Sequence, residues 1–400
     1  MDRQRLHPNA AARPPEQDHA GAGPFGWLMR ADAGVDAAGG PDRDNNFDIL
    51  RLVFASLVVV HHFSTLSNFG YGGIFFNLGH SSVLGFFVIS GFLIYWSYDK
   101  GRDLGAYTMR RLFRIFPLYA VTIALQVIIF MQIVPPRDLA ELGRYIAANM
   151  VFLNFLQPNF GVIPDHLPQD YFNGSLWTIK IEVFFYALVP FWLLLPGQRF
   201  WAVMMFIASS LFYLHFAYNS DTTKLATQIP PGQLRFFAVG MLLYMTVPLK
   251  GLSQRGVLAL LALALGIFFT GEYVKEFKPG SIWIEAAFVM LDPLSLGLAV
   301  YLVAFRLRPI SIPLDISYGV YLIHFPLYQI LMMLEIFQDN ALAFFLTVAV
   351  STYVLAYLSA RYLEGPAMEA GRWSARRIKG LIVLPHQTPR DAIPGASRHW

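Results

Sequence analysis

Two residues that lipid disfavours, Arg51 and His62, lie in one apolar stretch of the sequence, RLVFASLVVVHHFS. They are eleven positions apart, so in a helix they share a face and lie about 16 Å apart along the axis. The neighbouring His61 points about 80° away from Arg51. Ionisable groups inside a membrane usually face a protein interior or an aqueous cavity. The pair predicts anion binding by Arg51 and acid–base chemistry by His62; a snorkelling anchor and a structural histidine are the alternatives.

A carboxylate that could orient His62 occurs in the stretch GSLWTIKIEVFFYALVP. Glu182 lies seven residues beyond Ser175, about 10 Å deep if this helix starts at the outer surface. Counted from the other side of the membrane, His62 reaches about the same depth. A carboxylate beside an imidazole orients the ring and raises its basicity. We therefore predict a catalytic pair of His62 and Glu182; the alternative is that Glu182 pairs with the nearby Lys180.

Basic residues open a third apolar stretch, RRLFRIFPLY. Arg111 and Arg114 are three positions apart, so they are neighbours on one face of a helix. Together with Arg51 they could bind phosphate groups through bidentate hydrogen bonds. The sequence therefore predicts a cytoplasmic anion site. The alternative is ordinary membrane topology, with contacts to anionic lipid headgroups.

A polar stripe runs along the stretch SYGVYLIHFPLY, where Ser317, Tyr321 and His324 are spaced by four and three residues. His324 is expected near the middle of the membrane, either as a second site residue or as a structural hydrogen-bonding group. Ser90, in GFFVISGFLIYW, lacks the G-x-S-x-G pattern of a hydrolase nucleophile. We therefore expect no serine nucleophile there.

The composition indicates a membrane protein without cysteine chemistry. Of the 400 residues, 56% are hydrophobic and 14% are charged, whereas a soluble domain has about 25% charged residues. The chain has no cysteine, which excludes disulfides, cysteine-ligated metals and an acyl-cysteine intermediate. The net charge of +4 is small, so no nucleic-acid partner is expected. We also expect no bound metal and no permanently bound cofactor.

Recurring apolar runs of about 20 residues predict an all-α bundle of about ten transmembrane helices. The expected spans are 48–66, 80–98, 112–134, 175–195, 200–218, 231–248, 255–271, 283–305, 315–336 and 341–363. Lysine and arginine are concentrated in the connections after even-numbered spans, so the positive-inside rule places both termini in the cytoplasm. The outer connection at 135–174 contains an apolar part too short to cross. Arg235 and Asp292 are further charges in apolar spans, without an assigned role.

Polar regions flank the membrane part of the chain. Residues 1–44 are rich in Ala, Gly, Pro and Asp and contain no signal-peptide core, so a disordered cytoplasmic tail is predicted. Residues 45–366 form the predicted membrane domain, and residues 367–400 a basic cytoplasmic tail. The sequence does not indicate the oligomeric state.

Six ordered stretches make the chain resemble the acyltransferase-3 family of integral-membrane O-acyltransferases over about residues 44–366. They are FDILRLVFASLVVVHHF, GFFVISGFLI, RRLFRIFPLY, GSLWTIKIEVFFY, RFFAVGMLLY and SYGVYLIHFPL. The functional positions of the family fall on Arg51, His62, Arg111, Arg114, Ser175, Trp177 and Glu182. The chain departs from many members in two places: Val183 replaces a second acid, and SVLGFF lacks an aspartate before its Phe-Phe. These departures bear on the acceptor or subfamily, not on the reaction class.

The resemblance implies transfer of an acyl group, usually acetyl from acetyl-CoA, to a hydroxyl of a cell-surface or lipid-linked glycan at the bacterial inner membrane. His62 and Glu182 would be catalytic, and Arg51, Arg111 and Arg114 would hold the CoA phosphates. The residues expected to contact the acceptor are Ser175, Trp177, Tyr321 and His324. The acceptor, the choice of acetyl or succinyl, and direct transfer or an acyl relay are left open.

Two other classes of protein would also contain buried charges. A glycan or anion transporter or flippase would use buried Arg, His and Glu side chains as a substrate path and proton relay. The ordered motifs and the absence of a visible inverted repeat favour the acyltransferase. A structural membrane scaffold would leave these intramembrane charges without a purpose.

Overall fold

The computed structural model describes residues 45–67, 69, 74–217, 223–246, 251–277 and 281–382. Every regular element in these ranges is helical, which confirms the all-α prediction. The predicted tail at 1–44 and the end of the basic tail beyond residue 382 lie outside the described residues.

The helices of the described ranges follow the predicted spans closely. They are α1 (Phe47–Leu66), α2 (Ile74–Asp99), α3 (Leu104–Ile133), α4 (Leu139–Met150), α5 (Leu176–Trp192), α6 (Gln198–Ala217), α7 (Thr223–Gln228), α8 (Pro230–Met245), α9 (Gln254–Phe277), α10 (Ile282–Arg306), α11 (Ser317–Met333), α12 (Ala341–Ser359), a π-helix (Ala360–Glu364) and α13 (Gly365–Ile382). Each predicted span overlaps one α-helix, and the last span also overlaps the π-helix. Within these ranges, seven helices are long and apolar enough to cross a membrane. Helices α5, α8 and α11 have only 17, 16 and 17 residues, so the number ten remains a prediction.

Helix α2 lies at the centre of the bundle. In the most apolar stretch of 18 residues in α2, 72% of the residues are buried, whereas 28% are buried in that of α1. It packs closely on α8, where a Cβ atom at Gly91 would lie 2.1 Å from the carbonyl oxygen of Phe237. A Cβ atom at Gly240 would lie equally close, 2.1 Å, to the carbonyl oxygen of Val88. Two glycines therefore allow the backbones of α2 and α8 to touch.

The connection between α3 and α5 folds back against the bundle. Helix α4 runs antiparallel to α3, since Tyr145 donates a hydrogen bond to Gln126 at 3.0 Å and Tyr119 donates one to the Asn149 carbonyl at 2.8 Å. The chain then returns along α3 and α11, and the amide of Asn173 donates to the Leu322 carbonyl at 3.1 Å. Helix α5 therefore begins beside the first half of α11.

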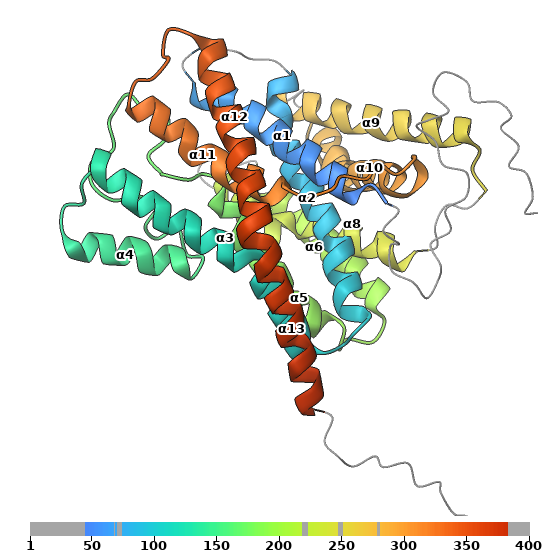
Figure 1. Ribbon diagram of the computed structural model, residues 1–400. Helices are drawn as coiled ribbons and strands as arrows, with labels where there is room; N and C mark the ends of the chain where they lie inside the picture. The colour runs from blue at the N-terminus through green and yellow to red at the C-terminus, as the bar shows by residue number, and fades with distance from the viewer. Residues whose placement is uncertain are drawn as a thin grey trace, which may run out of the picture.

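The last helices form one long rod. Helix α12, the π-helix and α13 follow each other without a break from Ala341 to Ile382, and Figure 1 shows them as one red helix across the bundle. Helix α13 packs on α3, where a Cβ atom at Gly371 would lie 2.6 Å from the Cβ of Phe113. Part of the predicted basic tail is thus an ordered helix.

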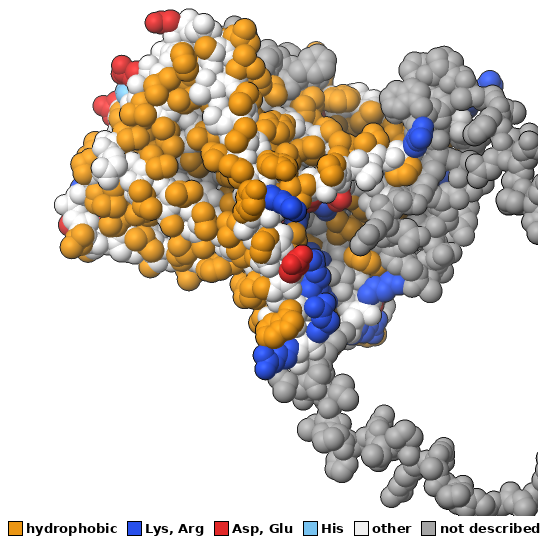
Figure 2. Space-filling model, in the orientation of Figure 1, with side chains coloured by type: hydrophobic (Ala, Val, Ile, Leu, Met, Phe, Trp, Pro, Cys, Tyr) orange, Lys and Arg blue, Asp and Glu red, His pale blue; other side chains and the backbone are white. Residues whose placement is uncertain are grey.

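The surface agrees with a membrane environment. Figure 2 shows a broad hydrophobic face over α3, α4 and α12, whereas lysines and arginines gather along α13. Exposed apolar side chains on α3, α4 and α12 include Leu125, Ile128, Leu139, Ile146, Leu346, Val350, Val354 and Leu358. An apolar surface of this extent is expected where lipid, not water, covers the protein.

Candidate active site

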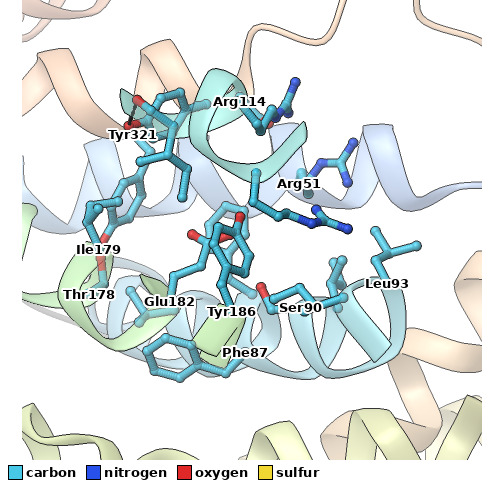
Figure 3. Close-up of a pocket in the computed structure, with 18 residues that line it drawn as sticks. Arg51, Phe87, Ser90, Leu93, Arg114, Thr178, Ile179, Glu182, Tyr186 and Tyr321 are labelled. Atoms are coloured by element: carbon cyan, nitrogen blue, oxygen red, sulfur yellow. Dashed lines mark hydrogen bonds between the residues drawn. The ribbon is translucent and has the colours of Figure 1, made fainter. Parts of the chain in front are cut away.

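A pocket lies where α1, α2, α3, α5 and α11 meet (Figure 3). Figure 3 shows Glu182 and Tyr186 projecting into it from α5, with Arg51 and Arg114 on the side away from Thr178. The predicted site residues that line this pocket are Arg51, Arg111, Arg114, Glu182 and Tyr321. Those that do not line it are His62, Ser175, Trp177 and His324.

Asp315, in the connection before α11, binds two of the predicted arginines. Its Oδ2 accepts hydrogen bonds from Arg51 at 3.0 Å and from Arg114 at 2.8 Å. Its Oδ1 accepts from the backbone N–H of Ser317 at 3.1 Å and from the Ser317 hydroxyl at 2.6 Å. Burial raises the pKa of Asp315, but the positive charges of Arg51 and Arg114 outweigh it and hold this pKa below its usual range. Sequence reasoning missed Asp315; its only sequence signal is its position just before a helix start.

Arg111 has a different environment from the other two arginines. Its guanidinium lies 5.7 Å from the ring centre of Tyr107 and 5.2 Å from that of Tyr186. Its Nε is buried and has no hydrogen-bond acceptor within the described part of the chain. Arg111 therefore keeps unused hydrogen-bonding capacity at the pocket wall, which an anionic ligand could satisfy.

Glu182 lies on the arginine side of the pocket. Its Oε1 accepts a hydrogen bond of 2.7 Å from the hydroxyl of Tyr186, one turn further along α5. One turn earlier, Oγ1 of Thr178 lies 2.8 Å from the hydroxyl of Tyr321 on α11. Glu182 therefore bonds to Tyr186, whose ring also contacts Arg111, and the predicted contact with His62 is not formed between these described residues.

His62 pairs instead with His324, across α1 and α11. Nδ1 of His62 lies 2.7 Å from Nε2 of His324, and the stacked rings are 5.0 Å apart. Nδ1 of His324 lies 2.9 Å from the carbonyl oxygen of Val320, which can only accept, so this nitrogen carries the proton. In the neutral ring, Nε2 of His324 then accepts the Nδ1–H of His62. Nε2 of His62 keeps its lone pair and makes no hydrogen bond within the described residues.

Tyr321 lies between the pocket and the histidine pair. Its ring centre is 6.2 Å from that of His324 and 5.7 Å from that of Phe86, which also lines the pocket. Its hydroxyl bonds to Thr178 and so connects α11 to α5. Tyr321 thus adjoins both the arginine-lined pocket and the histidine pair.

Ser175 and Trp177 lie at the start of α5. The Ser175 side chain is buried, and its backbone N–H donates to Oδ1 of Asn173 at 2.9 Å. The Trp177 ring packs edge-on against Phe87 at 6.5 Å. Neither residue lines the pocket, so their contact with the acceptor stays a prediction.

The sequence match to known families covers the helices that build this site. Residues 44–361 match the family model described as the acyltransferase domain, Acyl_transf_3. The chain belongs to the acyltransferase-3 family. The matched family model is described as an acyltransferase domain, and the apolar helices of the described residues are those of a multi-pass membrane protein.

Two of three relatives of this acyltransferase-3 protein are named as acyl-transferring enzymes. It is 24% identical over 214 residues to Acyltransferase MdmB of Streptomyces mycarofaciens, which covers 48% of this chain and 53% of that one. It is 31% identical over 153 residues to an O-acetyl transferase of Shigella phage Sf6, covering 36% and 45%. It is 29% identical over 170 residues to Nodulation protein 10 of Rhizobium leguminosarum bv. viciae, covering 39% and 46%. The chain spans about half the length of these relatives, and no solved structure matches it.

The acyltransferase has a second buried charged cluster that does not line the pocket. The guanidinium of Arg235 lies 3.7 Å from the ring centre of Tyr213 and donates to the Val289 carbonyl at 3.2 Å. Asp292 is fully buried and packs against Gly271, where a Cβ atom would lie 2.1 Å from its Oδ1. These contacts link α6, α8, α9 and α10 around the two charges.

Proposed function

We propose that this enzyme transfers an acyl group, in the first place acetyl, from cytoplasmic acyl-CoA to a hydroxyl of a cell-surface or lipid-linked glycan at the bacterial inner membrane. The family supports acyl transfer, and the name of the Sf6 relative supports an oxygen acceptor. The observation that carries the proposal is the position of the His62–His324 pair directly beyond an arginine-lined pocket.

The pocket suits the donor because CoA is a polyanion. Arginine binds phosphate through parallel hydrogen bonds, and the positive-inside rule predicts that this end of the bundle faces the cytoplasm. The Nε atoms of Arg51 and Arg111 are buried without a hydrogen-bond acceptor in the described structure. Phosphate oxygens would supply these acceptors. Arg114, which binds Asp315, would contribute its positive charge from the same wall.

His62 suits proton removal from the acceptor hydroxyl. Its Nε2 takes the proton while the hydroxyl oxygen attacks the thioester carbonyl carbon. The C–O bond forms, the C–S bond breaks, and CoA leaves as a thiolate, which needs little acid assistance because thiols have a low pKa. The thiolate or water then takes the proton from His62. His324 keeps Nε2 of His62 available, because it accepts the proton-bearing Nδ1.

Direct transfer requires the thioester and the acceptor to meet near Tyr321. We favour it over a relay because Tyr321 lines the pocket and its ring also lies beside that of His324. A relay would leave the acyl group on His62 before the acceptor binds. Intact mass spectrometry of purified enzyme with acetyl-CoA alone distinguishes the two: direct transfer leaves the enzyme mass unchanged, and an added acetyl mass contradicts it.

The function is tested in cells that lack the gene and carry wild-type, His62→Ala or His61→Ala protein at matched levels. Mass spectrometry of the surface glycans should show an acetyl-sized mass restored by wild type and His61→Ala only. Purified wild-type protein should also bind acetyl-CoA. Absence of both the glycan change and acetyl-CoA binding would contradict the proposal and favour a transporter.

A further inference from the structure

Asp315 occupies a special position among the carboxylates near the pocket. One of its oxygens accepts hydrogen bonds from Arg51 on α1 and Arg114 on α3, and the other accepts two from Ser317 at the start of α11. Both arginines line the pocket, whereas Asp315 does not. Asp315 thus fixes the relative positions of three helices. We call the side of the pocket formed by Arg51 and Arg114 the arginine wall.

The arginines would behave differently without this carboxylate. Two guanidinium groups that share one small region repel each other, and both side chains are long and flexible. A carboxylate between them offsets the repulsion and restricts their rotamers before any ligand binds. A ligand that meets arranged side chains loses less conformational entropy on binding.

We propose that Asp315 is a positioning residue for the acyl donor, holding Arg51 and Arg114 in the arrangement that binds the CoA phosphates. This inference rests on the proposed function, because it assigns the arginine wall to acyl-CoA. Asp315 acts through the arginines and does not touch the reacting atoms.

Asp48 provides a matched control for Asp315. It also forms an ion pair with Arg51, but its side chain is 54% exposed and that of Asp315 only 14% exposed. Asp48 lies in the first turn of α1, and among the described residues its side chain accepts a hydrogen bond from Arg51 but none from Arg114. Asp48→Asn therefore makes the same chemical change on the same arginine without releasing Arg114.

The test compares wild type, Asp315→Asn and Asp48→Asn in an acetyl-transfer assay with purified protein. For Asp315→Asn we expect the KM for acetyl-CoA to rise about tenfold, which is about 1.4 kcal/mol. The KM for the acceptor and kcat should change less than about threefold. Asp48→Asn should stay within about twofold of wild type in every constant. If Asp315 had a purely structural role, Asp315→Asn would lower the unfolding temperature without selectively raising the KM for acetyl-CoA.

Arg114→Lys and the double variant with Asp315→Asn add a second measurement. If Asp315 acts through Arg114, the two changes affect the KM for acetyl-CoA less than additively. Additive effects, or an unchanged or lowered donor KM in Asp315→Asn, would overturn the inference. If Asp315→Asn does not fold, Asp315→Glu takes its place, because it keeps the carboxylate and should fold. It should raise the KM for acetyl-CoA less than Arg114→Lys does. An equal or larger rise would overturn the inference. Wild type that neither binds acetyl-CoA nor transfers acetyl would instead contradict the proposed function itself.

Discussion

A histidine whose Nδ1–H is held by a second histidine offers its other nitrogen as a base. In this protein the second histidine is itself fixed by a backbone carbonyl: His62 donates to His324, and His324 donates to the carbonyl of Val320. Among the described residues, no carboxylate takes part in this chain of hydrogen bonds. The proposed base is therefore oriented without an added negative charge in the apolar interior.

Replacing His324 by alanine is expected to slow acyl transfer without abolishing donor binding. The change removes the acceptor for Nδ1–H of His62, so His62 can rotate or carry its proton on the wrong nitrogen. We expect kcat to fall about tenfold or more in His324→Ala. In His62→Ala the fall in kcat should be larger, about 10² to 10⁴, which is what a general base contributes. Initial rates at saturating acetyl-CoA measure this, with His61→Ala as control. A wild-type rate in His324→Ala would mean that His324 only fills the core.

Asp315 also predicts how stability depends on pH. Its folded pKa is lowered, so its stabilising effect is complete above the ordinary carboxyl pKa of about 4 and is lost as the pH falls below it. Asp315→Asn lacks this contribution at every pH. The difference in unfolding temperature between wild type and Asp315→Asn, measured in detergent, should therefore be largest near pH 7 and shrink below about pH 4. A difference that does not change with pH would contradict this origin.

At the residue scale, local spacing could be predicted and long-range pairing could not. Arg51 lines the pocket and His62 lies beyond Tyr321, as expected for residues that share a face of α1 and are separated along its axis. His62 and His324 are 262 positions apart, and a single sequence contains no signal that joins them. Asp315 was missed for the same reason, because its arginine partners come from distant helices.

At the element scale, the start of α5 explains why Glu182 is not beside His62. Counting depth from Ser175 assumed that this helix begins at the outer surface. The chain instead runs alongside α11 before α5 starts, and Thr178 is already level with Tyr321. At 1.5 Å per residue along α5 and α11, Glu182 lies about 10 Å from the level of His324. Apolar patterning gave the helices correctly, but the path of a connection depends on tertiary contacts.

The contact of α2 with α8 should be intolerant of any side chain at Gly91. A methyl group there would collide with the backbone of Phe237, which cannot move without separating the helices. We expect Gly91→Ala to destabilise the protein by about 1–3 kcal/mol, as overpacking does, and to lower its unfolding temperature in detergent. Gly266→Ala is the control, since a Cβ atom there meets nothing within 4 Å. Equal unfolding temperatures for both variants would contradict the close contact.

At the scale of the whole molecule, the absence of cysteine makes the predicted orientation directly testable. Asp165 lies exposed in the predicted outer connection, and Glu369 lies exposed on α13 in the predicted cytoplasmic part. A membrane-impermeant thiol reagent should label Asp165→Cys in intact cells, and Glu369→Cys only after the membrane is opened. The unmodified protein gives the background. Labelling of Glu369→Cys in intact cells would show that the predicted orientation is wrong and that Arg51 and Arg114 do not face the cytoplasm.

The unbroken rod of α12, the π-helix and α13 has a practical consequence for imaging. A helix adds about 1.5 Å and about 100° per residue, so a helical partner fused in register to α13 takes a fixed direction and rotation. Most of the described chain is a bundle with an apolar surface, which gives few features for aligning single particles in electron cryo-microscopy. A rigid fusion to α13 would supply such a feature, and its angle could be adjusted one residue at a time.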